Sequence, residues 1–237
     1  MEVNRETMDY DVVVVGAGPS GLATAIKIKQ LNSDINVCIL EKGSEVGAHI
    51  LSGNVFETRA LDELIPDWRK KDSPIKTKVS KEKFLFLSKS KSLSWPTWLL
   101  PSVQKNHNNY IISLANLCRW LATEAENLGV EIFPGFAASK ILYSEDNKVL
   151  GVQTGDMGID KNGNNKDSFE PGININAKVT VFAEGCRGHL GKELIKKYNL
   201  SEGKSPQQYG IGFKEIWEID ESQHEEGLVM HTAGWPL

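Results

Sequence analysis

The chain has 237 residues and a mass of 26.3 kDa, and its 40% hydrophobic content is enough to build the core of one large or two modest domains. It carries 27 Lys and Arg against 31 Asp and Glu, and the resulting net charge of −4 excludes a chain-wide positive field that would hold a polyanion. We therefore expect no nucleic-acid partner.

The three cysteines lie far apart and form no CxxC pair, so neither a disulfide framework nor a zinc motif is predicted. No stretch approaches the ~20 uninterrupted apolar residues of a membrane-spanning helix. The first residues are polar and charged where a signal peptide would be apolar. We do not expect the chain to cross a bilayer, and association with a membrane surface stays open.

The first forty residues predict a strand, a helix and a second strand. Residues 10–16 (YDVVVVG) are typical of a strand buried on both faces. Apolar residues at helical spacing predict a helix over residues 19–31, which begins with the proline that favours a first turn. Residues 35–41 predict the second strand. This order at this length favours a parallel pair joined by a crossover helix.

The middle of the sequence becomes basic and then apolar. Residues 69–91 carry nine Lys and Arg and only two acidic residues. The stretch SLSWPTWLLPSV at 92–103 follows, and its prolines forbid a long regular helix. Apolar periodicity then predicts a helix over residues 110–128 and a strand over residues 130–133.

Further elements are predicted from turn residues and alternation. They are two strands within residues 139–154, a loop over 155–167, a strand over 177–185, a helix over 189–198 and a strand of a different sheet over 210–220. No strand or helix is predicted for the last seven residues.

Gly16, Gly18 and Gly21 form a GxGxxG pattern between the first strand and its helix, and Glu41 ends the next strand twenty positions later. In this context the pattern predicts a dinucleotide-binding turn. Gly16 permits a tight turn, Gly18 lets the backbone approach a pyrophosphate, and Gly21 lets the helix pack against the strand. Glu41 is suited to accept hydrogen bonds from an adenosine ribose. The alternative is an α/β turn that binds no phosphate.

The glycines alone do not distinguish FAD from NAD. The strand over residues 177–185 ends in Ala183, Glu184 and Gly185, more than a hundred residues beyond the glycine turn. A chain that leaves the nucleotide domain and returns with a strand and a glycine turn suits FAD, whose extended body needs contacts from distant segments.

Several segments resemble the electron transfer flavoprotein–ubiquinone oxidoreductase family, from about residue 10 to the last residue. The most specific are EKGSEVGAHILSG at 41–53 and FAEGCRGHLGK at 182–192. The resemblance implies a peripheral membrane enzyme of the respiratory chain. Such an enzyme takes electrons from reduced electron transfer flavoprotein and passes them through a [4Fe-4S] cluster and FAD to ubiquinone.

The resemblance also implies a fold: an α/β FAD/NAD(P)-binding Rossmann-like domain with a parallel sheet, an inserted segment and the start of a second, mixed α+β quinone domain. The implied segments are a tail (1–9), the first part of the FAD domain (10–75), a basic and apolar membrane-facing insertion (76–109), the return to the FAD domain (110–200) and the start of the quinone domain (201–237).

Site residues carry over position by position. Gly16, Gly18, Gly21 and Glu41 match the family's FAD loop and ribose ligand. Seven more residues fall in segments that line the cofactor there: Lys42, Ser52, Gly53, Ala137, Ala183, Glu184 and Gly185. The isoalloxazine does the redox work, so we expect no catalytic side chain and no metal ligand in this chain.

Family members are more than twice as long, and their cluster cysteines lie beyond this chain. We expect an N-terminal fragment that is inactive alone and binds FAD weakly or not at all. Cys38, Cys118 and Cys186 cannot replace the cluster ligands, since a cluster needs four converging thiolates. Cys38 and Cys118 are predicted to be small packed hydrophobes.

Residues 84–101 correspond to an apolar plateau on the membrane in the family, with Trp95, Trp98, Leu99 and Leu100 facing the lipid. Indole prefers the boundary between lipid and water, and the preceding lysines attract anionic lipid. A core-packed loop beside a solvated charge run is the alternative. The expected location is the inner face of a bacterial cytoplasmic membrane, or alternatively the mitochondrial inner membrane.

Two other functions stay open: a different flavin oxidoreductase, such as a geranylgeranyl-reductase-like or aromatic-hydroxylase-like protein, and a non-catalytic FAD-binding or membrane-docking module. For His49, a role in positioning the backbone is favoured over a proton-transfer role near the flavin. The cluster His224, Glu225 and Glu226 is predicted to be solvated surface.

Overall fold

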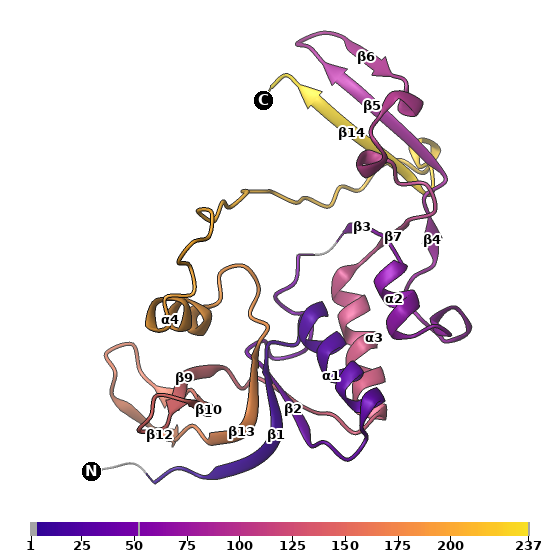
Figure 1. Cartoon of the computed structure of the whole chain (residues 1–237). Coiled ribbons are helices and arrows are strands. Elements are labelled where there is room, and N and C mark those ends of the chain that lie inside the picture. Colours follow the sequence, from indigo (N-terminus) through magenta and orange to yellow (C-terminus); the bar gives the residue numbers. More distant parts are fainter. Residues whose placement is uncertain (1–3, 52, 237) are drawn as a thin grey trace. The chain divides into compact units, whose positions relative to one another are not determined.

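The computed structural model describes residues 4–51 and 53–236 (Figure 1). The chain divides into two compact units. Unit 1 comprises Met1–Ile50 and Cys118–Gly210, and unit 2 comprises Leu51–Leu117 and Ile211–Leu237. Each unit is therefore built from two separate stretches of the chain.

Unit 1 contains a six-stranded sheet in the order β8-β2-β1-β13-β10-β9. Its strands are β1 (Thr7–Val15), β2 (Val37–Glu41), β8 (Glu131–Pro134), β9 (Ala138–Tyr143), β10 (Val149–Thr154) and β13 (Asn174–Phe182). β1 pairs in parallel with both β2 and β13, and β2 pairs in parallel with β8. β10 pairs antiparallel with β13 and β9. The predicted parallel sheet is confirmed.

The β1-α1-β2 crossover forms where the sequence predicts it. Val13 and Val14 of β1 are fully buried, as expected for a strand covered on both faces. α1 (Pro19–Leu31) has the predicted bounds and buries Leu22 and Ile26. Because the crossover returns to a parallel strand, the carboxyl ends of β1 and β2 lie at the same edge of the sheet.

The core of unit 1 joins this sheet to α4 (His189–Lys197), which lies beside β9 (Figure 1). Its buried members are Val13, Val15, Cys38, Leu40, Ala138, Ile141, Val152, Ile175 and Leu190. Burial raises the pKa of the Cys38 thiol to about 12 and that of the Cys118 thiol to about 11. Both behave as the small packed hydrophobes that the sequence predicts, whereas Cys186 is exposed.

The helix predicted over residues 110–128 begins later than expected. Residues at its predicted start form a short strand, β7 (Tyr110–Ile112), and α3 (Leu114–Asn127) follows. Ser113 separates the two, and its side-chain oxygen accepts the N–H of Asn116 at 3.3 Å, as an N-cap does. The isoleucine pair before Ser113 is β-branched and favours the strand.

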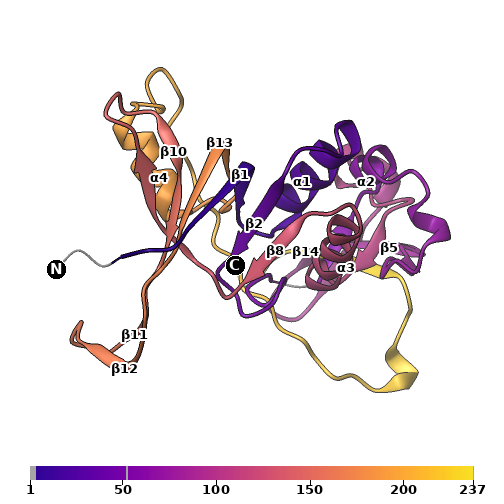
Figure 2. The same ribbon diagram turned by 90° about the horizontal axis from the view of Figure 1, so that it is seen from below.

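The loop predicted over residues 155–167 is also corrected. β11 (Met157–Ile159) and β12 (Asn165–Glu170) pair antiparallel and form a hairpin that extends away from the six-stranded sheet (Figure 2). The carboxylate of Asp160 accepts the N–H groups of Asn162 and Asn164, both at 2.8 Å. These bonds close the turn that the glycine- and asparagine-rich sequence provides.

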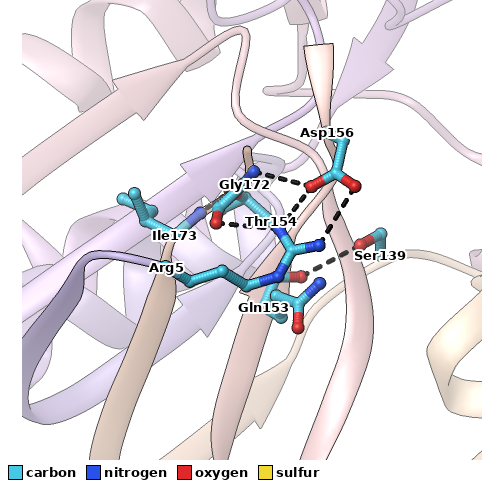
Figure 3. Close-up of polar contacts among 7 residues, drawn as sticks. All are labelled: Arg5, Ser139, Gln153, Thr154, Asp156, Gly172 and Ile173. Carbon is cyan, nitrogen blue, oxygen red and sulfur yellow. Dashed lines mark hydrogen bonds and ion pairs between the residues drawn. The ribbon is translucent and has the colours of Figure 1, made fainter. Parts of the chain in front are cut away.

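An ion pair ties the N-terminal segment to the base of this hairpin (Figure 3). The guanidinium of Arg5 donates to both carboxylate oxygens of Asp156 and, at 3.0 Å, to the carbonyl of Gly172. The N–H of Gly172 donates back to Asp156 at 2.7 Å. The Arg5 guanidinium, followed by this N–H, lowers the pKa of Asp156 to about 2.

We predict that Asp156→Asn lowers the melting temperature at pH 7 by about 2–4 °C. An ordinary Asp titrates near pH ~3.9, so a folded-state pKa of about 2 contributes stability that is present above the ordinary value and lost as the pH falls toward the folded value. We measure the free energy of unfolding in urea between pH 7 and pH 3. The difference in this free energy between wild type and the variant should become smaller below about pH 4. Asp146→Asn, in the exposed β9–β10 turn, is the control and should show no such gap.

Unit 2 contains two small sheets. One has the order β3-β7-β4 and the other the order β14-β5-β6. Their remaining elements are β3 (Asn54–Phe56), α2 (Arg59–Leu64), β4 (Thr77–Lys78), β5 (Lys81–Leu87), β6 (Ser92–Trp95) and β14 (Leu228–Gly234), with 3-10 turns at Trp68–Lys70, Thr97–Leu99, Ser102–Gln104 and Glu221–Gln223. β5 pairs antiparallel with β6 and in parallel with β14.

Two predictions for the C-terminal part are wrong. Residues 210–220 alternate as a strand would but form no strand in the structure, because no described strand pairs with them. Conversely, β14 runs into the last residues, where no strand was predicted, because β5, far earlier in the chain, supplies its hydrogen-bond partners. Across residues 4–51 and 53–236, no helix has the length and apolar character needed to span a bilayer.

Candidate functional site

A cavity of about 530 Å³ lies in unit 1 at the carboxyl ends of β1, β2 and β13. Ligands of open α/β sheets bind at this edge. Most of the predicted site residues of unit 1 line it: Gly16, Gly18, Glu41, Lys42, Ala137, Ala183, Glu184 and Gly185. The structure therefore brings together residues that are up to 169 positions apart in the sequence.

The three glycines of the GxGxxG turn have different roles. Gly16 has φ +106°, and a Cβ on it would lie 2.6 Å from the carbonyl oxygen of Ala183. A Cβ on Gly21 would lie 2.0 Å from the carbonyl oxygen of Gly16. These two glycines are required by backbone packing. A Cβ on Gly18 would meet no described atom within 4 Å, so its missing side chain leaves open space in the cavity wall.

α1 presents an uncapped N-terminus to this cavity. Gly18 occupies the N-cap position, no side chain makes a cap hydrogen bond there, and the first turn contains no acidic residue. Pro19 and Ser20, which begin the helix, line the cavity. The first backbone N–H groups of a helix lack intrahelical acceptors and carry partial positive charge, so they bind an anion such as a diphosphate. The wall beside Gly18 provides the room for one.

Glu41 lies between the glycine turn and the loop after β2. One carboxylate oxygen accepts the N–H of Ala17 at 3.0 Å, and the other accepts the N–H of Gly43 at 2.7 Å. These bonds hold the carboxylate at the cavity wall instead of in bulk solvent. A carboxylate oxygen can accept two hydrogen bonds, so each retains capacity for a sugar hydroxyl. The arrangement fits the predicted ribose ligand.

The side chain of Glu184 is turned toward α4. Its carboxylate accepts the N–H of Gly191 at 2.7 Å and that of Leu190 at 3.3 Å, and it lies 3.3 Å from Nδ1 of His189. Sequence reasoning places Glu184 among the cofactor-lining residues. The structure keeps it in the cavity wall but shows its oxygens engaged by the backbone of the helix.

Gly21, whose Cβ position faces the Gly16 carbonyl oxygen, is not among the residues that line this cavity. Gly53 belongs to unit 2, where its carbonyl accepts a hydrogen bond from Nζ of Lys214 at 2.7 Å. Ser52 lies outside the described residues.

Other cavity-lining residues were not assigned from the sequence: Ser20, Gly47, Ile50, Arg187, Gly188 and His189. Three of them lie in the FAEGCRGHLGK segment, so the resemblance marked the region without assigning the individual side chains. His49, for which a backbone-positioning role was favoured, is exposed at the cavity wall.

The cluster at residues 224–226 is surface, as predicted. Glu225 pairs with Lys81 at 2.9 Å and Lys83 at 3.4 Å, and these lysines hold the pKa of Glu225 below its ordinary value. Within the described part of the chain, no group of three or more His, Cys, Asp or Glu side chains is arranged to hold a metal ion.

Three of the four residues predicted to face a membrane are exposed in unit 2: Trp95, Trp98 and Leu99. Leu100 is partly buried. The ring of Trp95 packs edge-on against the ring of Phe86, with 5.9 Å between the two ring centroids, and this contact connects β6 to β5. Trp98 is 74% exposed in the turn that follows. The segment is therefore not packed into a core.

We predict effects of different size on stability for alanine at two glycines of the turn. Gly21→Ala should lower the melting temperature by at least about 4 °C, because its Cβ would collide with the Gly16 carbonyl. Gly18→Ala should leave it within about 2 °C of wild type, because its backbone has φ −76° and its Cβ meets open space. Thermal unfolding followed by circular dichroism measures both, and equal effects would contradict the assigned roles.

Comparison with known proteins extends these observations. A family model described as "ETF-QO, ubiquinone-binding" matches residues 209–237, and a Thi4 family model matches residues 1–63. Over 99% of its length the chain is 56% identical to the probable electron transfer flavoprotein-ubiquinone oxidoreductase of Acinetobacter baylyi and 55% identical to the Pseudomonas aeruginosa enzyme. Over its whole length it is 47% identical to the mitochondrial enzyme of Bos taurus. The chain spans 42%, 44% and 39% of these relatives, respectively.

Solved structures show the same fold. A geranylgeranyl bacteriochlorophyll reductase-like protein from Thermoplasma acidophilum matches 75% of this chain, and 39% of its own, with a TM-score of 0.52 and 21% identity. A flavoprotein/dehydrogenase from Cytophaga hutchinsonii matches 81% of this chain, and 42% of its own, with a TM-score of 0.52 and 20% identity. The chain has the mixed α/β, Rossmann-like fold with a parallel sheet that the sequence predicts.

Proposed function

We propose that this chain is the flavin-nucleotide-binding part of an FAD-dependent oxidoreductase that passes electrons from reduced electron transfer flavoprotein to ubiquinone. The observation that carries the proposal is the cavity wall at Gly18, where open space meets the uncapped N-terminus of α1. High identity to electron transfer flavoprotein-ubiquinone oxidoreductases over nearly the whole chain supports the choice of reaction.

Different residues of the cavity bind different parts of FAD. The first N–H groups of α1 bind the diphosphate, and the absence of a side chain at Gly18 lets it approach the backbone. Glu41, fixed by the N–H groups of Ala17 and Gly43, accepts hydrogen bonds from the adenosine ribose. A carboxylate at this position disfavours the 2′-phosphate of NADP by charge repulsion. The bound flavin supplies the redox chemistry.

The described cysteines do not fit an iron–sulfur cluster. Cys38 and Cys118 are completely buried among hydrophobic residues, and a cluster needs four thiolates converging on one point. The [4Fe-4S] cluster that we propose for the full-length protein therefore takes its ligands from outside this chain, and we assign no step here to it.

The alternative flavin oxidoreductases share the fold without close sequence identity. The geranylgeranyl-reductase-like structure is 21% identical, whereas the relatives from bacteria and mitochondria are 47–56% identical. A non-catalytic FAD-binding module remains a separate proposal, which activity of the full-length protein would exclude. The match of the ubiquinone-binding family model to residues 209–237 supports our proposal that β14 belongs to the quinone-binding part.

We predict that Gly18→Ala weakens FAD binding at least tenfold, because the new methyl group occupies the approach of the diphosphate to the backbone. The measurement is a titration of FAD with the chain, followed by quenching of flavin fluorescence; wild-type binding should be weak but saturable. Gly210→Ala is the matched control, since its Cβ also meets open space and Gly210 does not line the cavity. Equal affinity of Gly18→Ala and wild type would contradict the proposed site, as would no saturable wild-type binding.

We also propose that unit 2 docks on a membrane surface, at the cytoplasmic membrane of a bacterium or at the mitochondrial inner membrane. The support is the group of exposed apolar side chains around β6: Leu93, Trp95, Trp98, Leu99 and Val103. Lys89 and Lys91, exposed in the turn before β6, add attraction to anionic lipid of about 1 kcal/mol each close to the surface.

Trp98→Ser is expected to reduce binding to phosphatidylcholine vesicles containing phosphatidylglycerol by about thirtyfold, because a buried indole contributes on the order of 2 kcal/mol. Trp217→Ser is the matched control: Trp217 is 76% exposed, close to the 74% of Trp98, but lies in another segment. Flotation of the chain with the vesicles measures the difference. If both variants float like wild type, this surface does not bind lipid.

A further inference from the structure

Two helices of unit 1 begin at the cavity, and their N-termini differ. α1 begins at Pro19 without a side-chain cap. α4 begins at His189, and Glu184 accepts the N–H groups of Leu190 and Gly191 in its first turn. The dipole of α4 is therefore already matched with a carboxylate, whereas the N–H groups of α1 face the cavity.

Glu184 fixes the turn between β13 and α4, because its carboxylate accepts hydrogen bonds from the first turn of α4. Its side chain is only 11% exposed. A Cβ on Gly188 would lie 2.4 Å from Cβ of Glu184 and 2.7 Å from one of its carboxylate oxygens, so only glycine fits there. Gly185, Arg187 and Gly188 of this turn line the cavity. The carboxylate thus fixes a wall of the cavity through the backbone.

The same turn also contacts the glycine turn. The N–H of Ala183 donates to the carbonyl of Val15 at 2.9 Å. The carbonyl oxygen of Ala183 lies so close to Gly16 that a Cβ there would approach it to 2.6 Å. A displacement of residues 183–188 therefore moves the backbone against which the GxGxxG turn is packed.

We propose that Glu184 is a positioning residue for the dinucleotide: its carboxylate caps α4, holds residues 183–188 against Gly16, and so sets the geometry in which the N–H groups of α1 bind the diphosphate. The inference rests on the proposed function, and it assigns Glu184 no direct contact with the cofactor.

The sign of a charge-removing substitution tests this role. A carboxylate in the wall of an anion site repels the anion, so neutralising a carboxylate with no other role strengthens binding. Glu184→Gln removes the charge, but its amide NH₂ group faces an N–H donor and leaves one of the two helix amides without an acceptor. A positioning role therefore predicts weaker binding despite the lost repulsion.

The experiment compares Glu184→Gln, Glu184→Asp and wild type in two measurements. The first is hydrogen exchange at the amides of Leu190 and Gly191 without added nucleotide, where we expect at least tenfold faster exchange in both variants. The second is the affinity for FAD and for ADP, which has the diphosphate but no isoalloxazine; we expect a five- to tenfold loss for both ligands. Glu184→Asp keeps the negative charge but has a shorter side chain, so a loss of affinity in this variant is caused by changed geometry and not by changed charge. Glu126→Gln, an exposed residue of α3, is the control.

The outcomes separate this inference from the proposed function. If wild type binds FAD and Glu184→Gln binds it equally well or more tightly, the inference is overturned and the proposed function stands. If wild type binds neither FAD nor ADP, the proposed function fails, and with it the inferred role toward the dinucleotide. If the amides of Leu190 and Gly191 exchange at the wild-type rate in Glu184→Asp, the proposed capping of α4 by Glu184 is overturned, even if Glu184→Gln fails to fold.

Discussion

The close approach of three backbone segments determines the geometry of the site. The end of β1, the first turn of α1 and the end of β13 meet with no side chain between them: a Cβ on Gly21 would lie 2.0 Å from the Gly16 carbonyl oxygen, and one on Gly16 would lie 2.6 Å from that of Ala183. Because the turn is this tight, the helix begins at the cavity. The N–H of Ala17 also comes within hydrogen-bond distance of Glu41.

Sequence reasoning succeeds where the physical cause lies within a few tens of residues. The buried strand at Val12–Val15, the helix that begins at Pro19 and the glycine turn each have a local steric or hydrogen-bonding cause. It fails where the cause is a distant partner. β14 forms because β5, more than 140 residues earlier, pairs with it, and residues 210–220 form no strand although their alternation is favourable. A local pattern records a tendency to extend but not the presence of a partner strand.

The side chains of the site also divide into those that local sequence explains and those that depend on a distant partner. The sequence places Glu184 at the end of a returning strand, and in the structure Glu184 lines the cavity. The direction of its carboxylate depends on α4, whose first amides receive it, and no spacing in the sequence indicates this. Gly53, assigned to the same site from its segment, belongs to unit 2, and its place in the site stays a prediction. A resemblance transfers positions along a chain more securely than it transfers the orientation of each group.

The electrostatics of the cavity are compatible with the proposed diphosphate site, although the chain is acidic overall. Glu41 and Glu184 both line it, yet each carboxylate receives two backbone N–H groups, which spread its charge over fixed dipoles. The first N–H groups of α1 have no such carboxylate. Lys42 and Arg187 also line the cavity but are exposed, so solvent and salt weaken their attraction for an anion. The proposed diphosphate site therefore depends on the position of a few amides, and the net charge of −4 does not oppose it.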